Sequence, residues 1–168
     1  MVYKVGDRII HAREGLSTIT SETNIAGNDY FVVVADKGDR ENIYVMKSRT
    51  ENIIRPIMSH EEAHKVLEYM GTVDPAFINN TKQRRDQYRK RLLSGNVYDL
   101  AYLSCQLYLF EFYNANGILV KLGPTDLQML KDAESILFDE LSISLNVPRE
   151  KMKEEAERII PRPELKPL

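Results

Sequence analysis

A short stretch in the middle of the chain, residues 81–95, carries the residue types most able to do chemistry. It reads TKQRRDQYRKRLLSG and contains one acidic residue, Asp86, and six basic residues: Lys82, Arg84, Arg85, Arg89, Lys90 and Arg91. The whole chain has a net charge of -2, so this positive charge is local. Such clustering indicates an anionic partner or a nearby acidic surface. The chemistry it favours is ion pairing with phosphate or carboxylate groups.

A helical arrangement of this stretch would gather its apolar residues on one side. Ile78, Tyr88 and Leu92 share one face of the helical wheel, which we expect to be buried. The cations bracket this face, with Arg84 and Arg91 on one flank, Lys82 and Arg89 on the other, and Arg85 close to the apolar residues.

Two interpretations of the basic stretch stay open. In the first, its cations contact nucleic-acid phosphates. In the second, they pair with acids of the same chain, because residues 99–140 hold seven acids and only two lysines. The candidate partners of Arg85 and its neighbours are then Asp132, Glu134, Asp139 and Glu140. Exposed pairs of this kind contribute about 0–1 kcal/mol each. Six cations exceed what packing needs, which favours the phosphate interpretation.

Other chemistry has little support. His60 and His64 are four residues apart, a spacing that can bind a metal on a helix, but no third ligand accompanies them. Cys105 lies among apolar residues, which fits a packing role. The chain has no phosphate-binding glycine loop and no nucleophile elbow. We therefore expect no enzyme, no metal site and no cofactor.

Composition is typical of a globular protein of the cytoplasm. The 168 residues are 43% hydrophobic, enough for a packed core. No apolar run is long enough to span a membrane, and the N-terminus MVYKVGDRII lacks the apolar segment of a signal peptide. The single cysteine fits a reducing compartment. The low net charge argues against a protein that binds nucleic acid by bulk charge alone.

The first third of the chain predicts β-structure. Short runs of β-branched and aromatic residues cover residues 8–11, 16–23, 30–34, 42–46 and 53–56. This spacing predicts a small antiparallel barrel or a strongly bent sheet. Residues 1–58 hold eight basic and eight acidic residues, so charge does not make this part a nucleic-acid binder. A sheet this small leaves an edge that can pair with a strand of another protein.

The remainder predicts five helices. Ser59 and Glu62 form a capping-box pattern, and the expected helices begin at residues 60, 74, 97, 124 and 149. The second continues through the basic stretch to Gly95, and the third is apolar over so much of its surface that we expect it at the centre of the bundle. The sequence thus predicts an α+β protein with a β module (residues 1–58), a five-helix module (59–160) and a flexible tail (161–168).

Several motifs follow one another along the chain in the order seen in a known protein family. They are Val5-Gly6-Asp7, Gly15, the strand Tyr30 to Val34, Ile54-Arg55-Pro56, and Lys82, Arg84 and Tyr88 followed by Leu93-Ser94-Gly95. The later run Asp126 to Leu145 adds a matching pattern of leucine and alanine. In order and spacing, over about residues 1–160, the chain resembles the CarD/CdnL family of bacterial transcription regulators.

The resemblance implies a fold and two partners. In that family the N-terminal module resembles a Tudor-like, SH3-like bent sheet and docks on the β subunit of RNA polymerase. The C-terminal helices contact promoter DNA at the upstream edge of the melted region and stabilise the open complex. Carried over, the polymerase contact falls on Ile43, Tyr44, Val45 and Arg49. The DNA contact falls on Lys82, Arg84, Arg85 and Arg89.

Some positions depart from the family pattern. The family usually places a tryptophan before the basic helix, as a wedge at the minor groove, but this chain has no tryptophan and Phe77 is the nearest aromatic residue. Phenylalanine can serve as such a wedge; the alternative is a core residue at a helix start. Where the family usually carries Arg-Asp-Leu, this chain reads Cys105-Gln106-Leu107, and its first turn reads His11-Ala12-Arg13-Glu14-Gly15 where the family has Tyr-Pro-x-His-Gly.

These observations lead us to expect a non-enzymatic transcription regulator, a monomer brought to the nucleoid by RNA polymerase. Its β module would bind the polymerase β subunit, and its helices would contact promoter DNA without sequence preference. The alternative is a protein–protein adaptor that binds RNA polymerase or another acidic partner without touching DNA. A steep salt dependence of DNA binding would distinguish the first from the second.

Overall fold

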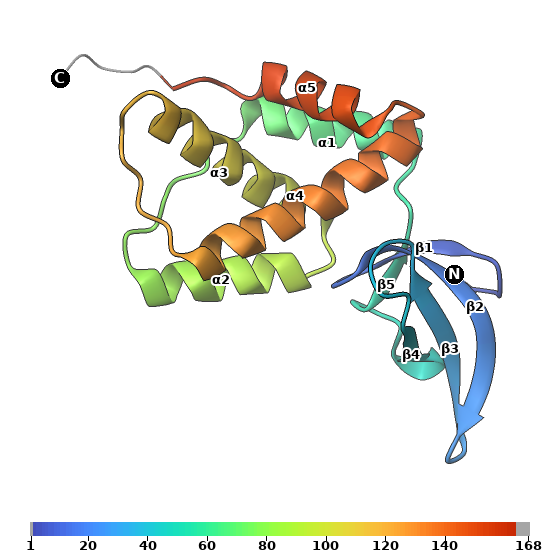
Figure 1. Cartoon of the computed structure of the whole chain (residues 1–168). Coiled ribbons are helices and arrows are strands. Elements are labelled where there is room, and N and C mark those ends of the chain that lie inside the picture. Colours follow the sequence, from blue (N-terminus) through green and yellow to red (C-terminus); the bar gives the residue numbers. More distant parts are fainter. Residues whose placement is uncertain (1, 164–168) are drawn as a thin grey trace.

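The N-terminal part forms one antiparallel sheet. The structure, a computed structural model, describes residues 2–163. Its strands are β1 (Arg8–His11), β2 (Gly15–Ile25), β3 (Asn28–Ala35), β4 (Asn42–Met46) and β5 (Ile54–Pro56), and a short 3-10 helix, η1 (Lys47–Arg49), follows β4. The strands lie in the order β4-β3-β2-β1-β5, and every pairing is antiparallel (Figure 1). The predicted strands and the bent antiparallel sheet are confirmed.

Side-chain alternation builds the core of this sheet. Phe31 and Val33 of β3 face the same side, and the register places Phe31 opposite Val45 of β4. The buried cluster on this side consists of Ile9, Ile19, Phe31, Val33, Val45 and Ile54. A register shift between Ile19 and Ser21 in β2 bends the sheet at that point. Among the described strands, β4 and β5 form the two edges.

The turn between β1 and β2 is held by a histidine and a glycine. His11 is buried, and its Nδ1 atom accepts the backbone N–H groups of Arg13 and Glu14, each at 3.3 Å. Desolvation on burial lowers the pKa of His11, which keeps the ring neutral and Nδ1 able to accept. Gly15 has φ +71°, and a Cβ atom there would lie 3.1 Å from Ile136. The turn therefore needs glycine both for its backbone and for the approach of a helix.

Five helices form the rest of the described chain. They are α1 (His60–Thr72), α2 (Thr81–Leu93), α3 (Val97–Ala115), α4 (Pro124–Leu145) and α5 (Arg149–Ile159). Local sequence explains their starts: Ser59 accepts the Glu62 N–H at 3.1 Å, and Asn96 accepts the Tyr98 N–H at 2.8 Å. The predicted α+β class is confirmed. No helix within residues 2–163 combines the length and hydropathy needed to cross a membrane.

One helix boundary was predicted wrongly. The second helix was expected to begin at Asp74, but α2 begins at Thr81, with the Asn80 side chain accepting the Gln83 N–H at 2.9 Å. Two carbonyl groups of the preceding segment are bonded by helix side chains: Gln106 of α3 donates to Ala76 and Arg84 of α2 donates to Ile78, both at 2.8 Å. Because these carbonyls have tertiary partners, residues 73–80 remain outside any regular element.

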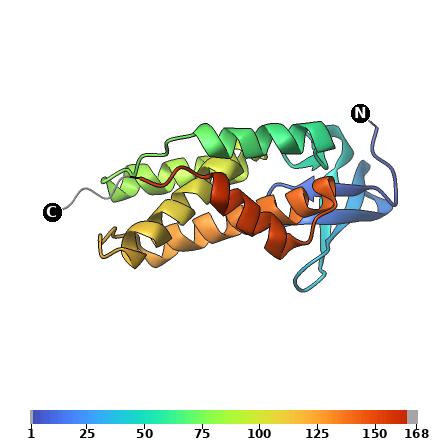
Figure 2. The ribbon, with the colours of Figure 1, turned by 90° about the horizontal axis from the view of Figure 1, so that it is seen from above.

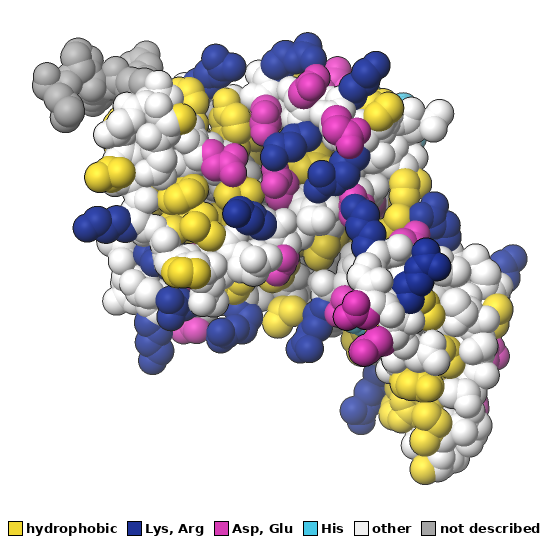
Figure 3. Space-filling view, viewed as in Figure 1, with side chains coloured by type: hydrophobic (Ala, Val, Ile, Leu, Met, Phe, Trp, Pro, Cys, Tyr) yellow, Lys and Arg dark blue, Asp and Glu magenta, His cyan; other side chains and the backbone are white. Residues whose placement is uncertain are grey.

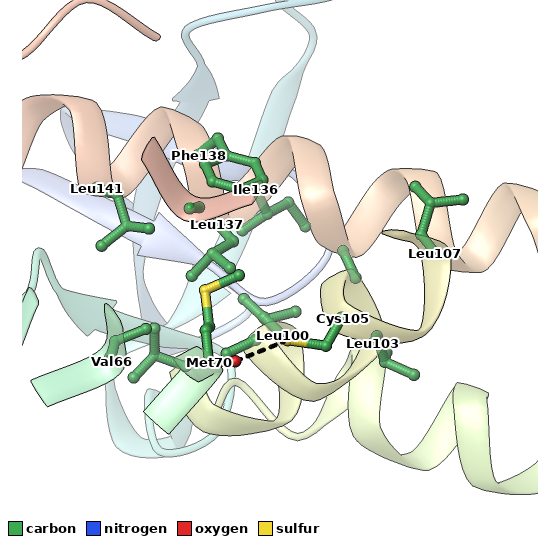
Figure 4. Packing of buried hydrophobic residues seen from close by; sticks show 14 of the residues in the cluster. Val66, Met70, Leu100, Leu103, Cys105, Leu107, Ile136, Leu137, Phe138 and Leu141 are labelled. Atoms are coloured by element: carbon green, nitrogen blue, oxygen red, sulfur yellow. Dashed lines mark hydrogen bonds between the residues drawn. The ribbon is translucent and has the colours of Figure 1, made fainter. Parts of the chain in front are cut away.

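Helix α4 runs through the middle of the helical module. It packs against the other four helices and against β2. Its residues Leu130, Leu137 and Leu141 are fully buried. Leu137 and Leu141 share one apolar cluster with Leu103 and Leu107 of α3 (Figure 4). The predicted central position of α3 is therefore shared with α4, which also connects the helices to the sheet.

The only cysteine belongs to this core. Cys105 is fully buried on α3, and its thiol lies 3.8 Å from the Met70 carbonyl oxygen (Figure 4). Burial raises the pKa of the Cys105 thiol to about 12, so the group stays protonated. Its surroundings fit the packing role expected from the sequence.

The sheet lies at one end of the helical module (Figure 2). Ile10 and Leu16 of the sheet and Met58 of the connection belong to the apolar cluster of the helices. The core thus continues across the boundary that we placed at residue 58, and the division into two modules there stays a prediction. Of the expected flexible tail, residues 164–168 lie outside the described part of the chain.

Candidate nucleic-acid interface

Helix α2 lies along one side of the helical module and presents two different faces. Toward the interior it buries Arg84 and Tyr88. Toward solvent it exposes Lys82, Gln83, Asp86, Gln87, Arg89 and Lys90. Dark-blue basic side chains accordingly gather along the lower edge of the helical module in the view of Figure 3, where α2 runs. The six cations of the basic stretch are therefore not equivalent.

Arg84 is an interior residue. Its Nε and Nη2 atoms donate to Asp126 Oδ2 at 2.9 and 2.7 Å, and its Nη1 atom donates to the Ile78 carbonyl oxygen. The two charged side chains are 7% and 0% exposed. The guanidinium group is thus enclosed, and its contacts support a role in holding α2 and the preceding segment in place.

Two further arginines, Arg85 and Arg91, form ion pairs with acids of the same chain. Arg85 reaches the other carboxylate oxygen of Asp126 at 3.2 Å, yet 42% of its side chain remains exposed. Arg91 pairs with Asp99, and its guanidinium carbon lies 4.0 Å from the centre of the Tyr102 ring. Pairing within the chain therefore occurs, but its main acceptor is Asp126.

The acids that we had considered as partners of Arg85 are engaged elsewhere. Glu134 pairs with Lys153, and Glu140 pairs with Arg55. Asp139 pairs with both Lys37 and Arg149, and Asp132 accepts from Gln128. None of these contacts involves α2, so the alternative in which Arg85 and its neighbours pair with this set was wrong; on α4 they pair with Asp126 instead.

The remaining three cations form the accessible part of the helix. Within residues 2–163, Lys82 and Lys90 make no ion pair, and Arg89 only approaches Asp86 at 4.0 Å with both side chains 62% exposed. An exposed pair at that distance contributes little. We name Lys82, Arg89 and Lys90 the outer cations. Together with the exposed part of Arg85 they can bind an anionic surface.

Phe77 lies in the segment just before α2, shortly before Lys82, the first of the outer cations. It is half-buried, with its ring 6.4 Å from that of Tyr113 in an edge-on arrangement. The hydrogen bonds from Gln106 and Arg84 to the carbonyls on either side of Phe77 hold its backbone. Gln106 therefore serves as an anchor for this segment.

The predicted polymerase contact lies on an edge strand. Ile43 packs against the sheet core and Val45 is buried within it, whereas Tyr44 between them is 51% exposed on the opposite face. Arg49 is exposed in η1. Val45 can therefore meet a partner only through its backbone, while Tyr44 and Arg49 offer side chains.

The two histidines of α1 lie together without further ligands. The rings of His60 and His64 pack edge to face, with centres 4.6 Å apart. Across residues 2–163, no group of three His, Cys, Asp or Glu side chains is arranged to hold a metal ion.

Sequence reasoning missed the residue that organises this region, Asp126. It stands in the first turn of α4, where an acid is explained by the helix dipole alone. A buried guanidinium requires a buried counter-ion, but the burial of Arg84 is evident only in the structure. The spacing of 42 residues between Arg84 and Asp126 hides that relation in the sequence.

Comparison with known protein families assigns this region. The family described as CarD, C-terminal domain, matches residues 65–157, more than half of the chain and including all of α2, α3 and α4. A search of curated proteins found no match. The match confirms the resemblance seen in the sequence, and its range covers both the outer cations and Asp126. The chain belongs to the CarD family of transcription-related proteins.

Proposed function

We propose that this protein regulates transcription by binding the β subunit of RNA polymerase through its sheet and promoter DNA through α2, and that it thereby stabilises the open complex. The observation that carries the proposal is the division of the basic helix: Arg84 is paired inside while the outer cations face solvent. Membership of the CarD family supports the same function.

The outer cations suit contact with the phosphate backbone. Long, exposed lysine and arginine side chains on one helix face bind phosphates without reading base sequence. The total charge of -2 keeps free DNA affinity low. A polymerase tether offsets this weakness, because it raises the local concentration of α2 near the promoter. Of the residues implied by the resemblance, Lys82, Arg89 and the exposed part of Arg85 fit the contact, Lys90 joins them, and Arg84 positions them.

Neutralising two outer cations tests the DNA contact. Lys82→Gln with Lys90→Gln should lower the salt slope of DNA binding by about 2, because each phosphate contact contributes about 1. The lifetime of the promoter open complex should fall in parallel. The matched control is Lys131→Gln with Lys151→Gln, which changes the charge equally on exposed parts of α4 and α5. Equal slopes for the two double variants would remove the DNA contact from the proposal.

Phe77 fits the role of a wedge beside the opened duplex. Its ring is only partly covered, its backbone is held on both sides, and it lies next to the outer cations in sequence. Phe77→Ala should shorten the open-complex lifetime and leave the salt slope of DNA binding unchanged, because the contact is apolar. Phe77→Leu keeps an apolar wedge and should retain most of the lifetime. Equal lifetimes for wild type and Phe77→Ala, at equal stability, would leave Phe77 a packing residue.

The polymerase contact is proposed at the β4 edge. An unpaired strand edge can add a strand of another protein, and an exposed aromatic side chain beside it provides an anchor. Tyr44→Ala should therefore weaken binding to the isolated polymerase β lobe at least about 30-fold, since aromatic hot spots contribute about 2 kcal/mol or more. Ile159→Ala, which truncates an exposed apolar residue on α5, is the control. Binding that resists the Tyr44 change would place the contact elsewhere.

An adaptor without DNA contact is the second candidate. One observation favours it: Arg84 pairs with Asp126 and Arg91 pairs with Asp99, and both pairs reduce the free positive charge of α2. An acidic protein surface would then occupy the outer cations. This function predicts a shallow salt dependence of DNA binding together with retained polymerase binding.

A further inference from the structure

One arginine of the sheet crosses into the helical module. Arg55 of β5 donates from Nη1 and Nη2 to the two carboxylate oxygens of Glu140 on α4, at 2.6 and 2.7 Å. The Glu140 side chain is 0% exposed and that of Arg55 is 23% exposed. This two-bond geometry fixes the plane of the guanidinium group as well as its position.

The third donor of the same side chain reaches the end of α2. Arg55 Nε donates to the Gly95 carbonyl oxygen at 2.6 Å, and Gly95 forms the turn that joins α2 to α3. Gly95 has φ +71°, a conformation that favours glycine. A single guanidinium group therefore holds the sheet, the C-terminal half of α4 and the end of the basic helix in one arrangement.

The connection between the modules is fixed by the same carboxylate. Glu140 Oε1 also accepts the backbone N–H of Met58 at 2.7 Å, and Ser144 donates to the Met58 carbonyl oxygen at 2.9 Å. Both backbone groups of this linker residue thus bond to α4. The linker is a clamped segment, and this arrangement does not leave it free to act as a hinge.

Cohesion of the junction does not require this ion pair. Ile10, Leu16 and Met58 already bury apolar surface against the helices. A buried ion pair gains little net stability over an apolar pair of the same size, because both charges lose their hydration. What an arginine fork adds is directional: it selects one orientation among those that the apolar contact would allow.

We propose that Arg55 and Glu140 are positioning residues, which set the orientation of the β4 edge relative to α2 and so place the outer cations on the promoter when the sheet is bound to polymerase. This inference rests on the proposed function. When the sheet is bound to polymerase, a rigid junction between sheet and helices keeps α2 at the DNA. A flexible junction would let α2 occupy many positions, so its outer cations would meet the DNA less often.

The orientation is measured first in the free protein. Spin labels are attached at Asn28→Cys and Gln87→Cys in a Cys105→Ala background. Double electron–electron resonance then reports the distance from the β2–β3 turn to α2. We expect one narrow distribution, which broadens in Glu140→Gln and in Arg55→Lys; the lysine keeps the charge but loses the fork. Lys37→Gln is the control, because its exposed pair with Asp139 spans the same junction. Narrow distributions in both test variants would overturn the proposal.

The functional arm separates binding from positioning. Glu140→Gln and Arg55→Lys should bind the isolated polymerase lobe and free DNA like wild type, yet shorten the open-complex lifetime about 5-fold or more, the lower range of typical coupling between sites. An unchanged lifetime would also overturn the proposal. If a single variant fails to fold, Arg55→Met with Glu140→Leu should fold and still show the broadened distance. If wild type itself neither binds the lobe nor lengthens the lifetime, the proposed function fails, while the distance measurement still tests the junction.

Discussion

Replacing Asp126 by alanine should lower the free energy of unfolding by about 3–5 kcal/mol, the usual cost of removing one partner of a buried ion pair. Asp126 is fully buried and accepts hydrogen bonds from both Arg84 and Arg85. Without it, the Arg84 guanidinium remains inside the protein with a single carbonyl partner, Ile78. The large effect arises from this unpaired charge and exceeds the net contribution of the intact pair.

Denaturant unfolding at neutral pH measures this prediction, with Asp132→Ala as the control on the same helix. Asp132 is exposed and, among residues 2–163, accepts a side-chain hydrogen bond only from Gln128, so its loss should change the free energy of unfolding by less than about 1 kcal/mol. Adding Arg84→Met to Asp126→Ala should restore part of the lost stability, because it removes the unpaired charge. Equal losses for Asp126→Ala and Asp132→Ala would show that the buried pair does not hold α2.

The same substitution connects stability to function. Arg84 joins α4, α2 and the segment that carries Phe77, through Asp126 and the Ile78 carbonyl. Loss of Asp126 should therefore displace that segment and the N-terminal half of α2 even where the protein remains folded. The consequence for DNA would be indirect, since no contact of Asp126 itself is involved.

Leu137→Ala is the second change with a large expected effect, a loss of about 2–5 kcal/mol in the free energy of unfolding. Leu137 is fully buried on α4, at the level where α3 and α1 approach (Figure 4). It belongs to the same apolar cluster as Leu100 of α3 and Met70 of α1. Because packed helices collapse only partly into the space, the truncation leaves a cavity in addition to the lost apolar burial.

Thermal or denaturant unfolding tests this value, and Ile143→Ala is the matched control. Ile143 lies on the same helix and is 37% exposed, so its truncation should cost well under half as much. A cost for Leu137→Ala no larger than that control would mean that the core around α4 is loosely packed.

Local signals were sufficient for most elements. The side chain of Ser59 caps the helix that follows it as expected, because an N-cap needs only residues within one turn. The runs of β-branched and aromatic residues likewise predicted where β3 and β4 lie. The start of α2 was misplaced because the decisive partners, Gln106 and Arg84, reach the Ala76 and Ile78 carbonyls from outside the segment.

The candidate site was likewise predicted only in part from the sequence. The number and density of cations in residues 81–95 were evident from the sequence and indicated an anionic partner. A helical wheel placed Arg84 and Arg91 together on one flank, but it could not show that Arg84 is enclosed and Lys82 is exposed. That distinction depends on a carboxylate 42 residues further along the chain.

Residue order and local hydrogen bonding thus determine where strands, turns and caps form, because those forces act over a few residues. The division between positioning and outer cations, the clamp of Arg55 on Glu140 and the exposure of Tyr44 depend on contacts between elements far apart in the chain. Their physical basis is the cost of leaving a charge or polar group without a partner once the helices pack. Only the packed arrangement shows which of six similar cations have met that requirement and which are left to bind another molecule.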